Sequence, residues 1–309
     1  MFRKEIKSVT RDDGKKIKLI IYSSENMQAF ADGLKSLPAN PESHVHENDL
    51  FESDDWSDPW STGGHTKEEI HGMIRHGSDN TELTQKIKLY IDDVNNTAKV
   101  EKYKTIEYRP FGCAVCVPRA LSGNPNCMIL PKKQAVKTRI INLVVDSGVS
   151  GGISESKYKA LGSVMARAIY DMERSGFRVR LTVVDTTDNH QSSNKTILVS
   201  KITLKDEREP MNLARILYPL TEPSFPRRVG FTLISRAPEW DDCWSLGVMS
   251  GPESLKKKIY NTVIGTNAIG LTFDTMCDMI SNKGDRKDVQ KIIEYIFEKL
   301  EENEHDNTP

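Results

Sequence analysis

The stretch "RIINLVVD" (139–146), which continues as "SGVSGG" (147–152), decides how the rest of the chain is interpreted. Its first part is a continuous apolar run, typical of a strand that is covered on both faces of a parallel sheet. The run stops at Asp146 and opens into small and hydroxyl residues. A strand that ends in this way can hold a divalent metal, cradle a phosphate, or turn into a helix with Asp146 as a capping residue.

The segments around this strand alternate between strand and helix patterns. We predict further strands at residues 15–22, 177–187, 195–205, 228–235 and 268–274, of which 195–205 is antiparallel to the strand before it. We predict helices at residues 23–37, 66–77, 81–94, 154–176, 211–220, 252–264 and 286–302. Ser24 is the expected N-cap of the first helix, and Thr66 with Glu69 forms a capping box. The pattern predicts an α/β protein with a central, mostly parallel sheet flanked by helices.

The chain is longer than one typical domain, at 309 residues. We expect residues 1–137 to form an N-terminal α+β and irregular region that elaborates the α/β domain of residues 138–302. Residues 303–309 are expected to be a disordered tail. Residues 38–64 are acidic and rich in turn formers, so they are expected to form a long loop.

The composition limits the classes of partner and location. The chain carries 43 basic and 44 acidic side chains, a balance that gives no global attraction to nucleic acid or to an anionic membrane. The longest apolar runs are far shorter than the roughly 20 residues that span a bilayer. The N-terminus has no apolar segment typical of a signal peptide. Five cysteines, sparse and odd in number, are typical of reduced thiols. We therefore expect a cytoplasmic protein with no membrane contact.

Acidic side chains follow several of the predicted strands. In a sheet of this kind ligands bind outside the carboxyl ends of the strands. Oxygen ligands gathered there suit Mg²⁺ or Mn²⁺. The candidate metal ligands are Asp146, Ser150, Asp185 and Asp241. The alternative is that Asp146 only caps the following helix. The glycines at 148, 151 and 152 do not form a dinucleotide-binding fingerprint, so nucleotide binding has little support.

The order strand, Asp146-x-Gly148-x-Ser150, helix is similar to the metal-ion-dependent adhesion motif, Asp-x-Ser-x-Ser, of von Willebrand factor A domains. Gly148 stands where that family has its first Ser. The resemblance implies a von Willebrand A-like, Rossmann-like fold for residues 138–300. It also implies a Thr and a second Asp from other loops, for which the order of elements offers Thr186 or Thr187 and Asp241 or Asp242. The wider layout, including "GNPNCM" (123–128), resembles an uncharacterised group of bacteriophage proteins.

Two further groups of residues have competing interpretations. Cys113, Cys116 and Cys127 include a Cys-x-x-Cys pair typical of zinc ligands, but no fourth ligand is close in sequence, so buried reduced thiols are the alternative. Basic pairs and triplets stand at 132–133, 227–228 and 256–258. They form either a solvated surface or, if they meet in space, a groove for nucleic acid.

The loop "APEWDDCW" (237–244) combines two large aromatics with three acids. Aromatic side chains surrounded by charge are typical of recognition surfaces. The candidate partner-binding residues are Trp240, Asp242 and Trp244. The alternative is that the tryptophans pack into a domain seam.

Taken with the resemblance, the sequence favours a non-enzymatic, phage-encoded protein-interaction module. It would bind a host or viral protein through the carboxyl edge of its sheet, with or without Mg²⁺ or Mn²⁺. One alternative is a metal-assisted phosphoryl-transfer or nuclease enzyme that uses Asp146, Asp185 and Asp241. Another is a protein that associates with RNA or ribonucleoprotein, for which a merged basic groove is required.

Overall fold

The chain forms two compact units in a computed structural model, one of residues Met1–Tyr90 and Ile140–Pro309 and one of residues Ile91–Arg139. The structure describes residues 1–43, 45–78, 80–97, 106–112, 114–131, 139–148, 153–188, 196–238, 247–248, 252–265, 267–281 and 283–306. None of the helices in these ranges is long and apolar enough to cross a membrane.

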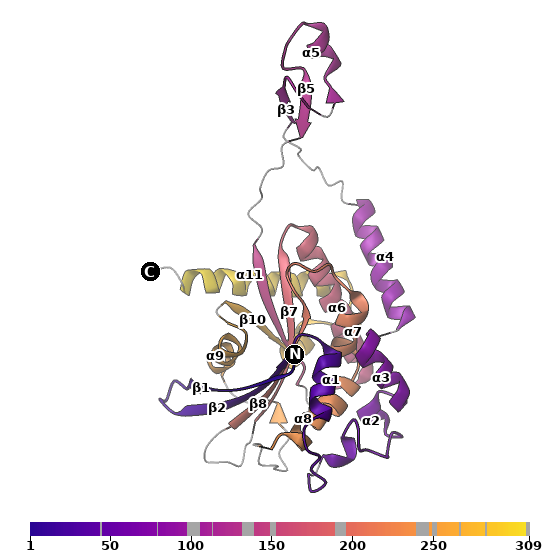
Figure 1. Ribbon diagram of the computed structural model, residues 1–309, viewed down its shortest axis with the longest axis vertical. Coiled ribbons are helices and arrows are strands. Elements are labelled where there is room, and N and C mark those ends of the chain that lie inside the picture. The colour runs from indigo at the N-terminus through magenta and orange to yellow at the C-terminus, as the bar shows by residue number, and fades with distance from the viewer. Residues whose placement is uncertain are drawn as a thin grey trace. The chain divides into compact units, whose positions relative to one another are not determined.

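A mixed sheet forms the centre of the larger unit (Figure 1). Its strand order is β1-β2-β8-β7-β6-β10, and the short β9 pairs with β7. The strands are β1 (Arg3–Thr10), β2 (Lys16–Ser24), β6 (Ile140–Asp146), β7 (Arg178–Asp188), β8 (Thr196–Lys205), β9 (Gly247–Val248) and β10 (Ala268–Thr272). The pairs β2–β8, β6–β7 and β6–β10 are parallel, whereas β1–β2, β7–β8 and β7–β9 are antiparallel.

The predicted α/β class with a central sheet flanked by helices is therefore confirmed, but the sheet is not mostly parallel. Three antiparallel pairs make the difference, two of them hairpins. The hairpin β7–β8 was expected from its short polar connection. The hairpin β1–β2 adds a second antiparallel hairpin at the edge of the sheet. It belongs to the sheet because β2 also pairs with β8.

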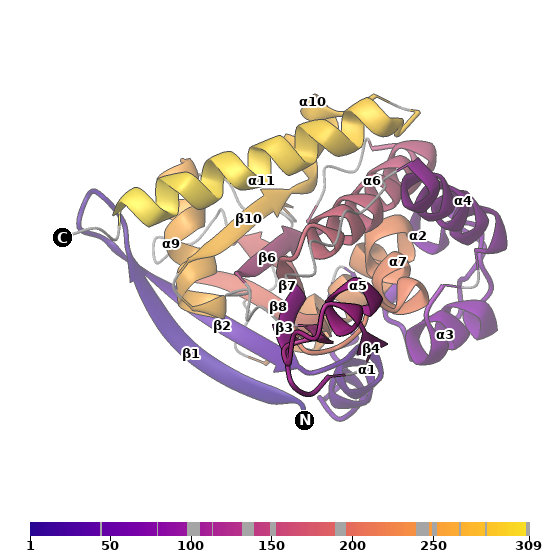
Figure 2. The ribbon, with the colours of Figure 1, turned by 90° about the horizontal axis from the view of Figure 1, so that it is seen from above.

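Helices cover both faces of this sheet (Figure 2). The longer helices that lie wholly or, for α4, partly in the larger unit are α1 (Met27–Lys35), α3 (Lys67–His76), α4 (Thr81–Thr97), α6 (Glu155–Arg174), α7 (Leu213–Thr221), α8 (Phe231–Arg236), α9 (Glu253–Ile264), α10 (Phe273–Met279) and α11 (Arg286–Asp306). Short turns of helix are η1 (His46–Asn48), α2 (Pro59–Thr62) and the π-helix η2 (Phe225–Gly230). One apolar cluster joins the sheet to α1, α6 and α7, and a second joins the opposite face to α9.

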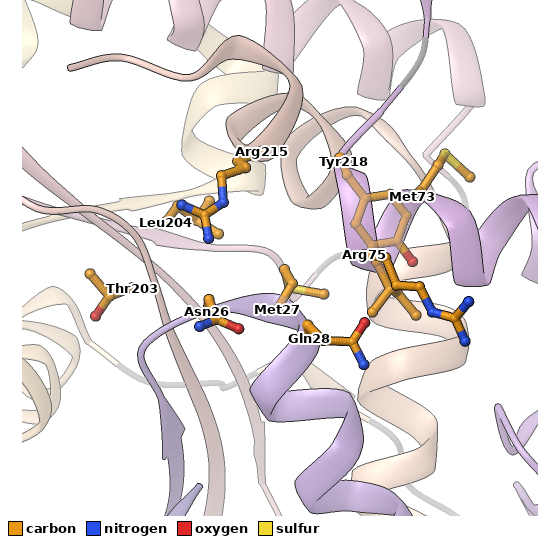
Figure 3. Close-up of a pocket in the computed structure, with 11 residues that line it drawn as sticks. Asn26, Met27, Gln28, Met73, Arg75, Thr203, Leu204, Arg215 and Tyr218 are labelled. Atoms are coloured by element: carbon orange, nitrogen blue, oxygen red, sulfur yellow. The ribbon is translucent and has the colours of Figure 1, made fainter. Parts of the chain in front are cut away.

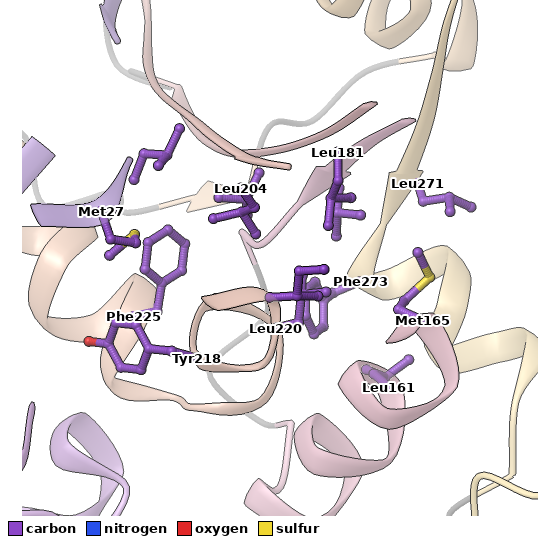
Figure 4. Packing of buried hydrophobic residues seen from close by; sticks show 14 of the residues in the cluster. Met27, Leu161, Met165, Leu181, Leu204, Tyr218, Leu220, Phe225, Leu271 and Phe273 are labelled. Carbon is purple, nitrogen blue, oxygen red and sulfur yellow. The ribbon is translucent and has the colours of Figure 1, made fainter. Parts of the chain in front are cut away.

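Strand β6 lies between β7 and the edge strand β10 and is covered on both faces. Ile141, Leu143 and Val145 belong to the cluster on the α6 side, and Val144 belongs to the cluster on the α9 side. Alternate side chains of a strand point to opposite faces, so a strand covered on both faces needs apolar residues at both sets of positions. The prediction of a strand buried on both faces is confirmed. Figure 4 shows the same packing one strand away, where Leu181 points toward the helical side chains Leu220 and Leu161.

The smaller unit contains a three-stranded antiparallel sheet of order β3-β5-β4. Its elements are β3 (Ile106–Arg109), β4 (Ala114–Val115), α5 (Val117–Leu121) and β5 (Met128–Pro131). The division of the chain into units differs from a boundary at residue 138. Residues 1–90 belong to the larger unit because β1 and β2 complete its sheet.

The capping residues in the sequence predicted the start of α3 correctly but not the start of α1. The Thr66 and Glu69 side chains form the predicted capping box, and Gly77 ends the helix with a φ of 90°. Ser24 is not the N-cap of α1, because it is still part of β2. The helix begins two residues later, where Oδ1 of Asn26 accepts a hydrogen bond from the Ala29 N–H at 2.8 Å.

Residues 228–235 are helical, so the predicted fourth strand is wrong. They continue from α7 through η2 into α8 as a nearly unbroken helical segment. Residues 216–230 are all buried, and so are residues 232–237. A helix that is enclosed on all sides is apolar all round, and over a few residues it cannot be told from a buried strand by periodicity.

Three arginines of this helical segment hold the acidic loop of residues 38–64 against it. Arg228 donates to the carbonyl oxygens of Glu47 and Asp55 and to the hydroxyls of Ser53 and Ser61, over distances from 2.7 to 3.3 Å. Its guanidinium also lies 4.5 Å from the centre of the Trp56 ring. Arg227 donates to the Trp60 carbonyl at 2.7 Å and stacks over the same residue's ring. The basic pair at 227–228 is therefore buried, and a solvated surface or nucleic-acid groove is excluded for it.

Arg236 completes this contact through a buried ion pair. Its Nε and Nη2 atoms donate to the two carboxylate oxygens of Asp49 at 2.6 and 3.1 Å. Close by, the Leu50 N–H donates to the Thr232 hydroxyl at 2.7 Å. The loop is thus an ordered part of the larger unit, and two of its acids, Asp49 and Glu52, pair with the buried Arg236.

We predict that Asp49→Ala destabilises the protein by about 3–5 kcal/mol, because it leaves the Arg236 guanidinium buried without its main counter-charge. The two side chains are 0% and 3% exposed. Glu52→Ala is the matched control, since Glu52 pairs with the same arginine but is 52% exposed, and it should cost less than about 1 kcal/mol. Urea unfolding of both variants measures the difference. Equal losses for the two variants would contradict the assignment.

Candidate functional site

Asp146 ends β6 and its carboxyl group is held by three other parts of the larger unit. The Thr186 hydroxyl of β7 donates to Oδ2 at 2.5 Å, and the Tyr260 hydroxyl of α9 donates to the same oxygen at 3.0 Å. The Gly148 N–H donates to Oδ1 at 3.1 Å. Asp146 is therefore not only a capping residue of the next helix. The N-cap of α6 is Ser154, whose hydroxyl accepts from the Lys157 N–H.

Asp185 directly follows Val184, the residue of β7 that pairs with Asp146. An ideal Cβ on Gly230 would stand 2.2 Å from Oδ2 of Asp185, so the carboxyl group lies directly against the backbone of η2. The Asp185 carboxyl accepts no hydrogen bond and forms no ion pair with any residue that the structure describes. The Asp185 side chain stands on the α6 side of the sheet, like Val183. Asp146 receives the hydrogen bond from Tyr260 on the α9 side.

The two carboxyl groups meet next to Gly148. An ideal Cβ on Gly148 would lie 3.2 Å from Oδ1 of Asp146 and 3.4 Å from Oδ1 of Asp185. Burial raises the pKa of Asp146 to about 6, although the donors from Thr186, Gly148 and Tyr260 oppose that rise. Burial, and then the negative charge of Asp146, raise the pKa of Asp185 to about 7. The site is thus a pair of coupled acids whose ionisation falls near neutral pH.

Two tyrosines belong to this site and were not identified from the sequence. Tyr260 supplies a donor to Asp146, and its ring packs over Gly270, where a Cβ would stand 2.3 Å from the ring. The Tyr158 hydroxyl donates to the Ser147 carbonyl at 3.1 Å. Burial and the charges of Asp185 and Asp146 raise the pKa of Tyr158 well above its ordinary value. Both residues look like ordinary core positions of amphipathic helices, so only the fold shows that they reach the acids.

Most other residues predicted for this site lie outside the described part of the chain, and a further acid of β7 stands apart from it. Asp188 is three residues further along β7 than Asp185, which is about 10 Å in an extended strand, and it is fully buried there. The candidates Ser150, Trp240, Asp241, Asp242 and Trp244 lie outside the described residues. The argument that placed residues 237–244 at the carboxyl edge fails in any case, because they follow the helix α8 and not a strand.

The described side chains fit a divalent metal only in part. Asp146, Asp185 and the Thr186 hydroxyl are oxygen donors, as Mg²⁺ and Mn²⁺ prefer. However, Oδ2 of Asp146 already accepts two hydrogen bonds, which leaves mainly its Oδ1 and Asp185 for a cation. No group of three or more His, Cys, Asp or Glu side chains that could hold a metal occurs among the described residues. Ligands from elsewhere would be needed to complete a metal site.

Two cavities of the larger unit have neither Asp146 nor Asp185 in their walls. One of about 30 Å³, room for a single water, is lined by residues of α1, α3, α7 and β8, and Figure 3 shows Arg215 reaching over it toward Asn26 and Thr203. The other, about 100 Å³, lies between α9, β10 and α11 and has Tyr260 in its wall. Neither is large enough for a nucleotide, whose sites measure roughly 300 Å³ or more.

The cysteine group is only partly described. Cys113 lies outside the described residues. Cys116 and Cys127 are brought together, since the Cys116 N–H donates to the Cys127 carbonyl at 2.7 Å. Both are free thiols and neither is buried, so the expectation of buried cysteines is wrong for these two. Zinc binding by this group stays a prediction.

Comparison with known proteins identifies the family but not an activity. The model of a family described as a domain of unknown function (DUF7192) matches residues 6–296, so the chain belongs to that family. No curated protein and no solved structure matches the chain. The function therefore has to be argued from the site itself.

The acid pair predicts a specific pH dependence of stability. Below the ordinary aspartate pKa of 3.8 the carboxyls are protonated in both the folded and the unfolded chain. As the pH rises toward 7 the unfolded chain ionises first, so the folded protein loses stability over that interval and does not regain it at higher pH. We expect Asp185→Asn to remove much of this loss, and to stabilise the protein by roughly 2 kcal/mol at pH 8 and much less at pH 4.

Asp278→Asn is the control, because Asp278 is an exposed aspartate of the same unit. Thermal and urea unfolding of the two variants and the wild type across this pH range provide the measurement. A gain for Asp185→Asn that is the same at both pH values would show that the pKa of Asp185 is not raised by folding.

Proposed function

We propose that this chain is a non-enzymatic protein-interaction module, encoded by a bacteriophage, with a von Willebrand A-like sheet. It binds a host or viral protein through the carboxyl edge of β6 and β7. Asp185 is the contact residue, and Asp146 with Thr186 forms the floor beneath it. A cation on the partner, either a basic side chain or a divalent metal held jointly by both proteins, neutralises the acid pair.

The observation that carries this proposal is the Asp185 carboxyl group. It is partly exposed, lies beside a second carboxyl, and accepts no hydrogen bond from the described residues. Leaving an acid in this state lowers the stability of the free protein, since burial and Asp146 both disfavour its charge. Groups that are unfavourable for folding are typical of binding sites, where the partner supplies the missing interaction.

The arrangement around Asp146 supports the resemblance to A domains. The motif strand β6 is an interior strand that is parallel to both of its neighbours, and its acid stands at the carboxyl end. Thr186, one of the two threonines that the order of elements offered, donates directly to Asp146. Thr272 of β10 is level with Asp146 on the other side. Hydroxyls and acids from three adjacent strands therefore stand at one edge of the sheet.

The two alternatives have less support in the described residues. The enzyme hypothesis needs a third acid or a base beside Asp146 and Asp185. Asp241, the third acid predicted from the sequence, lies outside the described residues. The RNA reading needs a merged basic groove, but Arg227 and Arg228 are buried. Of the triplet 256–258, Lys258 is paired with Asp12 and Lys256 with Glu253.

A capture experiment with matched aspartate variants tests the proposal. Tagged wild type, Asp185→Asn and Asp278→Asn are expressed in phage-infected cells and isolated with bound proteins, with and without a chelator. We expect a partner that is retained by the wild type and Asp278→Asn and lost, at least tenfold, by Asp185→Asn. Loss with the chelator as well would identify a metal between the partners. Equal capture by all three proteins, or hydrolysis of nucleic acid by the wild type with Mg²⁺ or Mn²⁺, would reject the proposal.

The glycine at position 148 provides a separate prediction about metal affinity. Gly148→Ser places a hydroxyl next to both carboxyls and restores the full Asp-x-Ser-x-Ser order, and Gly148 does not have a left-handed φ that would exclude serine. We expect this variant to gain a Mg²⁺- or Mn²⁺-dependent rise in melting temperature larger than that of the wild type. The double variant Gly148→Ser, Asp146→Ala should show none. No rise in any variant at millimolar metal would exclude Asp146 as a metal ligand.

A further inference from the structure

The mixed sheet of the larger unit ends on one side in an open strand. Strand β1 pairs with β2 and stands last in the strand order, and Figure 2 shows it as the outermost strand. It is eight residues long, keeps one continuous register with β2, and is exposed at every position except Val9. An edge of this kind presents a row of backbone N–H and C=O groups to which a further strand can pair.

The turn between β1 and β2 shows which backbone groups of β1 point outward. The Arg11 N–H donates to the Lys15 carbonyl at 2.9 Å, and this pair continues the register of the two strands. Hydrogen-bonded and non-hydrogen-bonded pairs alternate along an antiparallel ladder. The odd-numbered residues of β1 therefore direct their backbone groups toward β2. The even-numbered residues direct theirs outward, and these are Lys4, Ile6, Ser8 and Thr10.

Outward groups of two copies of β1 can meet only in certain antiparallel registers. The two-fold axis must pass through a residue, because an axis between residues would set outward groups against inward ones. An axis at Glu5 places Glu5 opposite its own copy, and an axis at Lys7 places Lys7 opposite its own copy. Like charges that are directly opposite are destabilising. An axis at Ile6 avoids both, and axes farther from the middle of β1 pair fewer residues.

The register about Ile6 is complementary in charge. It sets Glu5 of each copy opposite Lys7 of the other, at a non-hydrogen-bonded position, where opposite side chains are closest. Ile6, whose side chain is 55% exposed, meets its own copy. The remaining pairs hold no like charges: Arg3 with Val9 and Lys4 with Ser8. The edge is therefore complementary to itself in this register.

Glu5 and Lys7 stand where such a contact needs them. Their side chains are 48% and 40% exposed and form an ion pair with each other along the strand, at 3.1 Å. Lys7 also donates to the Thr262 carbonyl of α9 at 3.1 Å, which places both side chains on the α9 side of the sheet. Two copies of β1 would join these ion pairs into one network, in which each charge has neighbours of the opposite sign.

We propose that the edge of β1 binds β1 of a second copy of this chain, antiparallel and with the two-fold axis at Ile6. The dimer is closed, because both copies use the same edge. Charged side chains on an edge strand usually prevent pairing with other strands. Here their order permits pairing with the same sequence and opposes other registers. The dimer is independent of the function proposed above, since Asp146 and Asp185 belong to other strands.

Sedimentation velocity of the full chain over a series of protein concentrations tests the proposal. We expect the wild type to show a monomer–dimer equilibrium. Glu5→Lys sets lysines opposite each other on both sides of the axis, and Lys7→Glu does the same with glutamates. Each variant should raise the dissociation constant of the dimer roughly tenfold or more, because two attractive pairs become repulsive.

An equimolar mixture of these two variants tests the register. In a mixed dimer both cross-strand pairs again have opposite charges, so we expect dimers at concentrations where each variant alone is monomeric. The double variant Glu5→Lys, Lys7→Glu exchanges the two charges within one strand and should dimerise as the wild type does. Lys4→Glu is the matched control. It changes the net charge as Lys7→Glu does, but position 4 is opposite Ser8, so the dimer should persist.

The substituted side chains are exposed, so circular dichroism should be unchanged in all variants. A wild type that stays monomeric at every concentration would overturn the proposal and leave this edge to a strand of a different protein. Dimers that neither single charge reversal weakens would place the interface elsewhere on the chain. A mixture that fails to dimerise would reject the register about Ile6, and assemblies larger than a dimer would reject two-fold pairing.

Discussion

The larger unit depends on a buried acid that must be satisfied where β6, the strand between β7 and β10, ends. Strand β6 is apolar on both faces, and its last residue, Asp146, is 2% exposed. An unpaired carboxyl in such a place is strongly unfavourable. Its three donors come from β7, from α9 and from the turn after β6, so the requirement fixes the register of the neighbouring strand and the position of the helix on one face.

Buried positive charge in the larger unit has partners of a different kind. Among the described residues, Arg227 and Arg228 donate to backbone carbonyls and hydroxyls of the loop 38–64, whereas Arg236 pairs with the buried carboxylate of Asp49. Carbonyl groups of a loop can meet a fixed guanidinium only if the loop has one conformation. A segment that is acidic and rich in turn formers is thereby ordered by residues almost 200 positions away.

This distance explains what the sequence could and could not predict. Strands β2, β6, β7, β8 and β10 and most helices follow from local periodicity and caps such as Thr66 with Glu69. Residues 228–235 were misassigned because complete burial removes the periodic signal. Asp146 could be placed from the end of its strand, and the resemblance left Thr186 and Thr187 open as its neighbour. Tyr260 and Gly230 could not, because their roles arise from packing between segments far apart in the chain.

The two glycines beside the acids have a common physical role. Gly148 and Gly230 are not in the left-handed region, so neither is required by backbone conformation. At Gly230 a side chain would occupy the space of the Asp185 carboxyl, and at Gly148 it would come within 3.2–3.4 Å of both acids. Their small size is therefore what allows two carboxyls to approach each other from opposite faces of the sheet. A serine at position 148 would add a hydroxyl ligand, but its Cβ would stand in close contact with both acids. Because the described residues form no ion pair with either acid, a positive group brought by the proposed partner would stabilise their ionised forms.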